Sequence, residues 1–246
     1  MDNKKILSIA MQQQAIDYNC SPEDFISNEN VVVISKENPK ARAYLKLPFT
    51  CALTSFGNNI VASVQSEMVD FISEYIKDKK IEDCFVPPNI FTLNDELQKH
   101  NAQITFCAQR QIPDVNLIKP IPCIYELRNL HPEEYSSLYG HPEWSNVTGS
   151  GKRKHLDRIA IGAFDGDKLI GLVGSEESCE TMWQIGFEVL PNYRGKGIAK
   201  ALTAKISLEI LSIGIVPFPG NRWANIRSLK TQISCGYKSA WVEMTA

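Results

Sequence analysis

The stretch from Gly186 to Ala199 constrains the fold more than any other part of this sequence. Apolar and β-prone residues over 182–190 predict a strand, which a Pro-Asn pair ends. A basic turn with two glycines follows at residues 194–197. Apolar residues then recur at helical spacing, at Ile198, Leu202, Ile206 and Ile210. The sequence therefore predicts a strand, a glycine turn and a helix in direct succession.

This succession is typical of an anion site. Backbone N–H groups at a helix start point outward, and the helix dipole adds partial positive charge. Gly195 and Gly197 let a phosphate approach the main chain, while Arg194 and Lys196 add full charges. The Walker loop and the dinucleotide fingerprint need other glycine spacings, and the sequence has neither. The turn is expected to bind another kind of phosphate ligand, and a solvated charged turn is the alternative.

Composition narrows the class of protein. The 246 residues allow one large or two modest domains, and 43% apolar with 22% charged residues fit a soluble globular chain. A net charge of −2 gives no basic field for nucleic acid. Seven scattered cysteines without a C-x-x-C pair argue against disulfides and zinc, and favour a reducing cytosol. No apolar run is long enough for a membrane span. We therefore expect a cytoplasmic protein that binds no metal, nucleic acid or membrane.

The first half of the chain mixes predicted helices and strands without a catalytic constellation. Strands are expected at 31–35, 49–56, 60–64 and 103–108, and helices over much of 1–30, at 66–77 and from Thr92 onward. Three prolines punctuate residues 111–122 and predict a linker, because proline excludes helix interiors and central strands. The expected organisation is a smaller N-terminal α/β domain at 1–118 and a second domain at 119–246.

The second half predicts a simple order of elements: strand, helix, three strands, helix, strand, helix, strand. An Asp-Gly-Asp turn at 165–167 predicts a hairpin between strands 159–164 and 169–175. Gly214 ends the long helix, and Asn225 caps the next one. The last strand is expected at 237–244. Strands and helices thus alternate through this half, and the mixed central sheet that we expect for it is implied by the resemblance described next.

Two motifs in this half resemble a known family. Arg194-x-x-Gly197-x-Ala199 is similar to the Gln/Arg-x-x-Gly-x-Gly/Ala motif of the GNAT superfamily of N-acetyltransferases. Asn225-x-x-Ser228, followed by Gly-Tyr at 236–237, resembles that superfamily's second cofactor segment. Residues 179–186 and 240–244 further resemble a bacterial two-domain branch. The resemblance implies an α/β (α+β) chain with a GNAT fold over 119–246 and acetyl-CoA as co-substrate.

The resemblance also implies which residues bind the coenzyme. Pantetheine would lie along the splayed strand at Val189, and Asn225 would bind the same arm with Ser228 nearby. The N–H groups of Gly195, Lys196, Gly197, Ile198 and Ala199 would hold the pyrophosphate, assisted by the side chains of Arg194 and Lys196. An ordinary N-cap is the alternative for Asn225, and the two roles can coexist.

The acid and the base are harder to assign. In many family members a tyrosine seven residues after the asparagine protonates the leaving thiolate, and here that position is Gln232. Alternation puts apolar Trp183, Ile185, Phe187 and Val189 on the strand face that usually carries the base. Glu180 is the favoured catalytic residue, with a plain surface glutamate as the alternative; the other candidates are Glu188, His141 and Glu143.

Other side chains keep two interpretations. Trp144 and Trp183 would form the wall of an acceptor pocket, or pack in the core. Cys179 and Cys235 suggest an acetyl-enzyme, but isolated cysteines are usually buried hydrophobes. The basic run at 152–154 would meet the coenzyme's 3′-phosphate or form a solvated loop.

We therefore predict an N-acetyltransferase that moves an acetyl group from acetyl-CoA to a primary amine of a small molecule or protein. A homodimer is one of the oligomeric states left open. The N-terminal domain would shape the acceptor site. Two rival hypotheses stay open. A CoA-binding pseudoenzyme or sensor would bind acetyl-CoA without turnover, as the missing tyrosine at Gln232 suggests. A protein-interaction module with a vestigial pocket would not bind the coenzyme at all.

Overall fold

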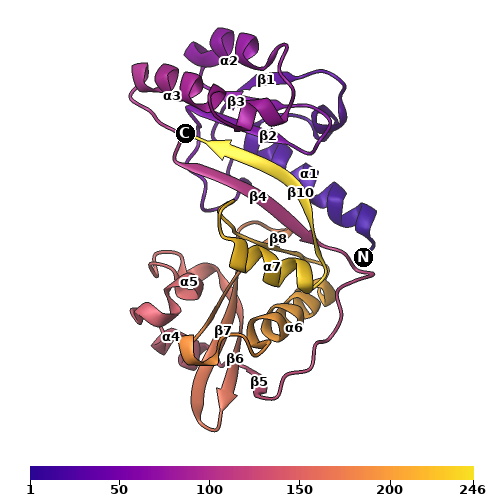
Figure 1. The fold of residues 1–246 in the computed structure, drawn as a ribbon, viewed down its shortest axis with the longest axis vertical. Helices are drawn as coiled ribbons and strands as arrows, with labels where there is room; N and C mark the ends of the chain where they lie inside the picture. The colour runs from indigo at the N-terminus through magenta and orange to yellow at the C-terminus, as the bar shows by residue number, and fades with distance from the viewer. The chain divides into compact units, whose positions relative to one another are not determined.

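The computed structural model describes residues 1–246, and the chain forms two mixed five-stranded sheets flanked by helices (Figure 1). It divides into two compact units that interleave along the sequence. We name residues 1–6, 111–220 and 225–238 unit I, and residues 7–110, 221–224 and 239–246 unit II. None of the helices combines the length and the apolar character that crossing a membrane requires.

Unit II is built on a sheet with the strand order β1-β3-β2-β10-β4. Its strands are β1 (Val31–Ile34), β2 (Cys51–Ser55), β3 (Val61–Val64), β4 (Phe106–Pro113) and β10 (Tyr237–Thr245). Its helices are α1 (Asn3–Tyr18), α2 (Val69–Ile76) and α3 (Asn89–Lys99), with short 3-10 turns η1 (Pro22–Ile26), η2 (Ser66–Met68) and η3 (Glu82–Phe85). Residues 3–6 of α1, 111–113 of β4 and 237–238 of β10 belong to unit I by the division above. One core cluster joins the sheet to α2 and α3 through buried side chains such as Leu53, Ile72 and Leu97.

A buried ion pair ties the last strand into this sheet. Arg110 on β4 donates from Nε and Nη2 to Oε1 of Glu243 on β10, at 2.8 and 2.6 Å. Burial alone would raise the pKa of Glu243, but the guanidinium groups of Arg110 and Arg42 lower it below its ordinary value. The carboxylate is therefore held in its charged form inside unit II.

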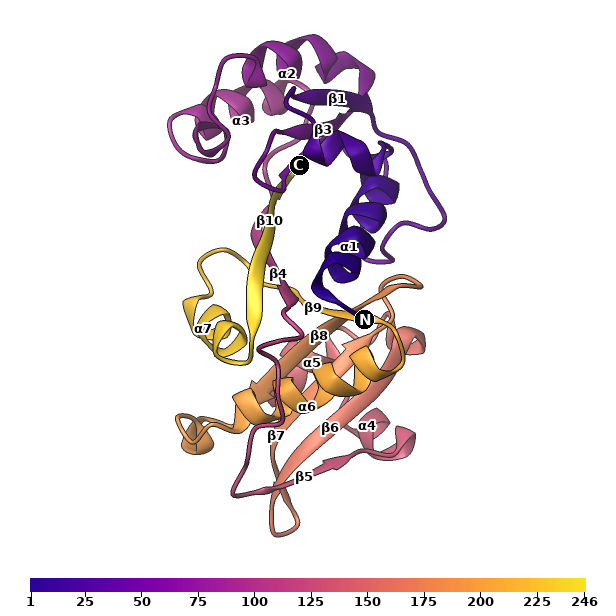
Figure 2. The same ribbon diagram turned by 90° about the vertical axis from the view of Figure 1, so that its right-hand side faces the viewer.

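Unit I contains a second sheet with the strand order β5-β6-β7-β8-β9. Its strands are β5 (Glu126–Asn129), β6 (Asp157–Asp165), β7 (Lys168–Glu176), β8 (Met182–Val189) and β9 (Val216–Pro219). Its helices are α4 (Pro132–Ser137), α5 (Ser145–Thr148), α6 (Ile198–Ser212) and α7 (Ile226–Ser234), with 3-10 turns η4 (Pro142–Trp144), η5 (Lys154–Leu156) and η6 (Pro191–Tyr193). Figure 2 shows α6 lying across the strands of this sheet.

The two faces of the unit I sheet bury different apolar clusters. Ile170, Val173, Ile185 and Val189 pack with the apolar stripe of α6. Leu172, the immediate neighbour of Val173, faces the other way and packs with side chains of α4 and η4. Trp183 and Phe187 pack against the same cluster as Ile185 and Val189, which confirms the predicted alternation along β8.

The structure confirms much of the predicted order of elements and corrects three details. β6 and β7 pair antiparallel, as the hairpin predicted at residues 165–167 requires, and the predicted neighbouring strands β2 and β3 also pair antiparallel. The helix expected from Thr92 begins at Asn89, directly after two prolines that the start of a helix tolerates. Residues 111–113, expected in the linker, extend β4. Pro113 is tolerated there because β4 is an edge strand and Pro113 is its final residue.

The third correction concerns the last strand. An unbroken second domain at 119–246 would place this strand in the unit I sheet, whereas β10 pairs antiparallel with β2 in unit II. Buried Trp241 and Met244 give the strand an apolar face, and Met244 joins the unit II core. The predicted boundary between domains 1–118 and 119–246 concerns parts of the chain that would fold on their own, and it stays a prediction. The two compact units are instead each made of several separate segments.

Candidate coenzyme-binding site

Strand β8 loses its partner on one side halfway along its length. Residues 182–185 pair in parallel with 216–219 of β9, whereas residues 184–189 pair with β7 up to the end of β8. β9 stops at Pro219, and beyond Ile185 no strand lies on that edge of β8. Such an edge presents backbone N–H and C=O groups to whatever lies beside it. The segment from Gly186 to Val189 can therefore add a strand-like ligand.

The backbone of Val189 makes its contacts with side chains. Its N–H donates to Glu188 Oε1 at 3.1 Å, and its carbonyl accepts from Arg194 Nε at 2.9 Å. The next residue, Leu190, donates its N–H to the carbonyl of Ile170. Arg194 Nη2 also lies 3.1 Å from Glu188 Oε1, so the two side chains form an ion pair beside the open edge. Any ligand that pairs with Val189 must replace these two contacts.

The turn after β8 has the geometry that the sequence predicts. Gly195 and Gly197 have φ angles of +81° and +80°, in the left-handed region that favours glycine. A Cβ atom at either position would meet nothing within 4 Å, so the turn is open on its outer side. The N–H groups of residues 195–199 take part in none of the hydrogen bonds of the structure, and the first such donor in α6 is Ala201, which bonds the carbonyl of Gly197 at 3.0 Å. The residues present therefore fit an anion at a helix N-terminus.

The two basic side chains of the turn point to its flanks. Arg194 pairs with Glu188, as described above. Lys196 Nζ donates to the hydroxyl of Tyr125 at 3.1 Å and lies 5.0 Å from the ring centroid of Tyr193. The hydrogen bond with Tyr125 raises the pKa of Lys196. Both charges lie close to the open N–H groups, and Arg194 must leave Glu188 to reach an anion bound there.

Helix α5 packs tightly against the middle of β8. A Cβ atom at Gly186 would lie 2.5 Å from the backbone carbonyl oxygen of Asn146, so only glycine permits this approach. Asn146 also donates from its side chain to Glu188, the carboxylate that contacts Val189. The position of Glu188 therefore depends on α5 as well as on Arg194.

The second predicted coenzyme segment forms the start of α7. Asn225 Oδ1 accepts from the N–H of Ser228 at 3.3 Å, which is an N-cap contact. Gln232 is fully buried and donates from Nε2 to Ser228 Oγ at 3.0 Å. The capping role of Asn225 is present, and its role toward a coenzyme stays a prediction.

The candidate bases do not come together in the structure. Glu180 lies exposed in the turn before β8, and Glu188 faces α5 on the sheet side opposite Trp183. His141 Nδ1 lies 3.7 Å from Glu143 Oε1 in an exposed loop. The assignment of the base to Glu180 stays a prediction.

The two tryptophans also lie apart. Trp144 is buried with Tyr135 and Leu172 on one face of the sheet. Trp183 packs against the α6 cluster on the other face, where its Nε1 is buried without a hydrogen-bond partner. The structure does not bring them together as one wall, and Trp183 is the one with a donor left for a ligand.

Asp157 is a candidate that the sequence analysis missed. It lies opposite Glu176 across the β6–β7 hairpin and accepts a hydrogen bond from the Tyr139 hydroxyl. Burial, followed by repulsion from Glu176, raises the pKa of Asp157 from 3.8 to about 6. A carboxyl with such a pKa is ionised at neutral pH and is a stronger base than an ordinary aspartate. The hairpin predicted from strands 159–164 and 169–175 would have indicated this pair. Extending the first strand back to Asp157 and the second forward to Glu176 brings the two carboxylates opposite each other.

The cysteines give no sign of a nucleophile. Burial raises the pKa of the Cys235 thiol to about 11, which opposes formation of the thiolate. Cys179 Sγ donates to the carbonyl of Met182 at 3.4 Å. The structure contains no group of three or more histidine, cysteine or acidic residues that could hold a metal ion.

A comparison with protein families covers the first of the two sequence motifs, at 194–199. Residues 124–209 match the acetyltransferase (GNAT) family. Similar solved structures include a GNAT-family acetyltransferase of Novosphingobium aromaticivorans DSM 12444, 19% identical over 58% of this chain and 65% of that chain, with a TM-score of 0.42. A GCN5-related N-acetyltransferase-like protein of Streptococcus suis 89/1591 is 16% identical over 77% and 72%, with a TM-score of 0.44.

A third structure contains the acetylated coenzyme. It is a GNAT superfamily phosphinothricin acetyltransferase of Sinorhizobium meliloti in complex with AcCoA, 14% identical over 48% of this chain and 86% of that chain, with a TM-score of 0.39. This chain spans 65% of the length of the Novosphingobium protein. No curated protein matches the sequence.

Proposed function

Because the chain contains a domain of the acetyltransferase (GNAT) family at residues 124–209, we propose that it transfers an acetyl group from acetyl-CoA to a primary amine. One observation carries the proposal: the open edge of β8 leads directly into a glycine turn whose N–H groups, over residues 195–199, have no internal acceptor. An extended amide chain with a diphosphate at its end has the two chemical features that this surface matches.

Binding would proceed by exchange of contacts at the end of β8. The N–H and carbonyl of Val189 would turn from Glu188 and Arg194 to the amide groups of the pantetheine arm. Arg194, released from Glu188, would move toward the diphosphate, which the N–H groups of residues 195–199 hold. Asn225 and Ser228 at the start of α7 would contact the same arm. The thioester supplies an acetyl group that is activated for attack by an amine.

On the acceptor side, two carboxylates are proposed as the base. Glu180, the candidate from the sequence, is exposed at the start of β8. Asp157, the candidate from the structure, has a raised affinity for a proton because burial raises its pKa to about 6. The base takes a proton from the acceptor ammonium, and the amine lone pair becomes available for attack. Trp183 is proposed to line the acceptor path, where its buried Nε1 has a donor to offer.

The test combines binding and turnover on a matched pair of variants. Isothermal titration with acetyl-CoA is followed by thiol release on a panel of primary amines. Arg194→Ala with Gly197→Glu should abolish coenzyme binding while the far-UV circular dichroism stays unchanged. Arg158→Ala with Gly214→Glu is the control, because it changes the charge by the same amount away from the turn. It removes an exposed, ion-paired arginine from β6 and places the new glutamate just beyond the C-terminal end of α6. Retained affinity in the first variant would refute the site.

Turnover separates the enzyme from its rival. Thiol release with any amine supports the transferase, whereas tight coenzyme binding without release on the whole panel supports a sensor. Nothing in the structure favours the sensor. The acceptor, whether a small molecule or a protein, the formation of a homodimer and a cytoplasmic location are further proposals.

The proposal that residues 1–118 shape the acceptor site is better tested by point variants than by deletion. β10 pairs with β2, so removal of these residues would leave the last strand without that neighbour.

A further inference from the structure

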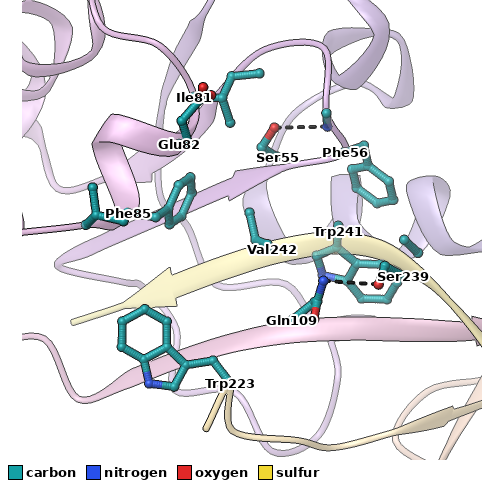
Figure 3. A pocket seen from close by; sticks show the side chains of 13 residues that line it. Ser55, Phe56, Ile81, Glu82, Phe85, Gln109, Trp223, Ser239, Trp241 and Val242 are labelled. Atoms are coloured by element: carbon teal, nitrogen blue, oxygen red, sulfur yellow. Dashed lines mark hydrogen bonds between the residues drawn. The ribbon is translucent and has the colours of Figure 1, made fainter. Parts of the chain in front are cut away.

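Unit II contains a cavity of about 590 Å³ that the coenzyme site does not use. It lies over β10, and all its lining residues belong to unit II (Figure 3). Four aromatic side chains dominate the lining, namely Phe56, Phe85, Trp223 and Trp241. The volume falls in the range of about 300–1,000 Å³ that is typical of small-molecule sites.

One wall of the cavity is fixed before any ligand arrives. The rings of Phe56 and Trp241 stack with centroids 5.3 Å apart and an angle of 24° between their planes. Trp241 Nε1 donates to Oε2 of the buried Glu243 at 2.9 Å, which fixes the orientation of the indole. Trp241 is itself buried, so it holds the partly exposed ring of Phe56 in place, and Phe56 loses little side-chain entropy when a ligand packs against it.

Trp223 forms another part of the lining and is 53% exposed. Its backbone is held to β4, because its N–H donates to the carbonyl of Cys107 at 3.3 Å and Arg222 forms a bridge with Ala108. The indole is therefore anchored through its main chain while half of the residue stays accessible. A large aromatic group presented in this way offers contact area at a small cost in entropy.

The lining has few polar side chains, and the one charged side chain among them is negative. Gln109 Nε2 donates to Ser239 Oγ at 3.0 Å at the base of the cavity, near Trp241 (Figure 3). Glu82 is the single charged residue among those that line it, and its exposed side chain forms none of the ion pairs of the structure. An anionic ligand would meet this carboxylate without a lining cation to offset it. A cationic ligand would meet the carboxylate and aromatic faces together.

We propose that this cavity binds a small organic amine, with an aromatic or other flat apolar body against Phe56 and Trp223 and a protonated amino group near Glu82. The proposal deepens the proposed function and rests on it only in part. A primary amine is the acceptor class of the proposed reaction, whereas binding in the cavity needs no coenzyme. Trp223 stands two residues before Asn225, so the cavity and the proposed coenzyme segment share one short stretch of chain.

The test measures binding of 2-phenylethylamine and of 2-phenylethanol, its neutral counterpart, to the full chain without acetyl-CoA. Isothermal titration gives the affinities, and quenching of tryptophan fluorescence reports occupancy. The amine should bind about three- to tenfold more tightly than the alcohol, since a carboxylate and aromatic faces add to the same apolar contact. Glu82→Gln should remove this preference and leave the alcohol unchanged. Trp223→Ala should weaken both ligands.

Two controls keep the result interpretable. Glu74→Gln removes an exposed carboxylate of α2 that does not line the cavity, and it should leave both affinities unchanged. Trp223→Phe should recover part of the loss if the aromatic face matters. Equal affinity of amine and alcohol, an unchanged preference in Glu82→Gln, or no binding of the amine at millimolar concentration would each overturn the proposal.

Addition of acetyl-CoA separates this proposal from the proposed reaction. Amine binding without thiol release upholds the cavity and counts against this amine as acceptor. The opposite outcome has two parts: the amine does not bind in the cavity, and thiol release continues with unchanged KM in both Glu82→Gln and Trp223→Ala. This outcome upholds the enzyme and overturns the amine site.

Discussion

Replacing Gly197 by alanine gives the sharpest test of the turn, because the structure separates its two effects. Gly197 has a φ of +80° and directly precedes α6, and a Cβ atom there would meet nothing within 4 Å. The loss of stability therefore comes from the backbone conformation alone, and it amounts to about 1–2 kcal/mol for an alanine in the left-handed region. The same Cβ would stand on the open side of the turn and keep a phosphate from the main chain.

Gly214 provides a matched control at the other end of the same helix. Its φ is +82°, and a Cβ atom there also meets nothing within 4 Å. Gly214→Ala and Gly197→Ala should therefore lower the free energy of unfolding by the same amount, within about 0.5 kcal/mol. Urea denaturation measures these losses. Only Gly197→Ala should weaken acetyl-CoA, by at least about tenfold, which corresponds to one lost hydrogen bond to a charged group.

Two results would refute this reasoning. Equal affinity of the two variants for acetyl-CoA would mean that the diphosphate does not approach the main chain at Gly197. A loss of stability at Gly197 much larger than at Gly214 would mean that the turn makes contacts that its open geometry does not indicate.

Three further predictions concern single side chains. Asp157→Asn should raise the free energy of unfolding at pH 7 by about 1–2 kcal/mol. The pKa of Asp157 rises from 3.8 to about 6 on folding, so ionisation of this carboxyl destabilises the folded protein as the pH increases through this window. The destabilisation is at most about 3 kcal/mol before solvent screening is considered. Urea titrations at pH 3.5 and 7 check the sign, and an advantage present at pH 3.5 but not at pH 7 would contradict it. Glu243→Gln should cost about 3–5 kcal/mol, because it removes the carboxylate that the buried Arg110 binds. The double variant with Arg110→Met should lose less, and a loss equal to or larger than that of the single variant would contradict the pairing. Arg194→Ala should raise the Kd for acetyl-CoA about tenfold in low salt. Titrations in low and high salt should show the difference shrinking as salt screens the charge, and an equal difference at both would argue for a packing role.

The local part of the site could be predicted from sequence because its determinants lie close together. The strand, turn and helix at 182–212 need only residues a few positions apart, and the structure places β8, the two left-handed glycines and α6 as expected. The faces of β8 followed from alternation for the same reason.

The pairing of the last strand could not be predicted, because it depends on contacts between distant parts of the chain. Glu243 and Arg110 are 133 residues apart, and nothing near either one indicates a buried partner. A second domain at 119–246 with the fold that the resemblance implies would have kept β10 in the unit I sheet, whereas its neighbours in space are β2 and β4.

Long-range contacts also decide the chemistry of single groups. Asp157 was missed because its raised pKa comes from burial and from Glu176 across the hairpin, and neither is visible in the residues beside it. The cavity of unit II joins residues from five separate stretches of sequence, and Glu82 and Trp223 are 141 positions apart.

Hydrogen–deuterium exchange with and without acetyl-CoA tests the central claim most directly. The N–H groups of residues 195–199 have no acceptor within the protein and should exchange rapidly in the free chain. Acetyl-CoA should slow this segment and the end of β8 at Val189, with little change in a peptide around Gly214. Saturating coenzyme that leaves residues 195–199 unprotected, or that protects only other parts of the chain, would contradict the claim that this turn holds the diphosphate.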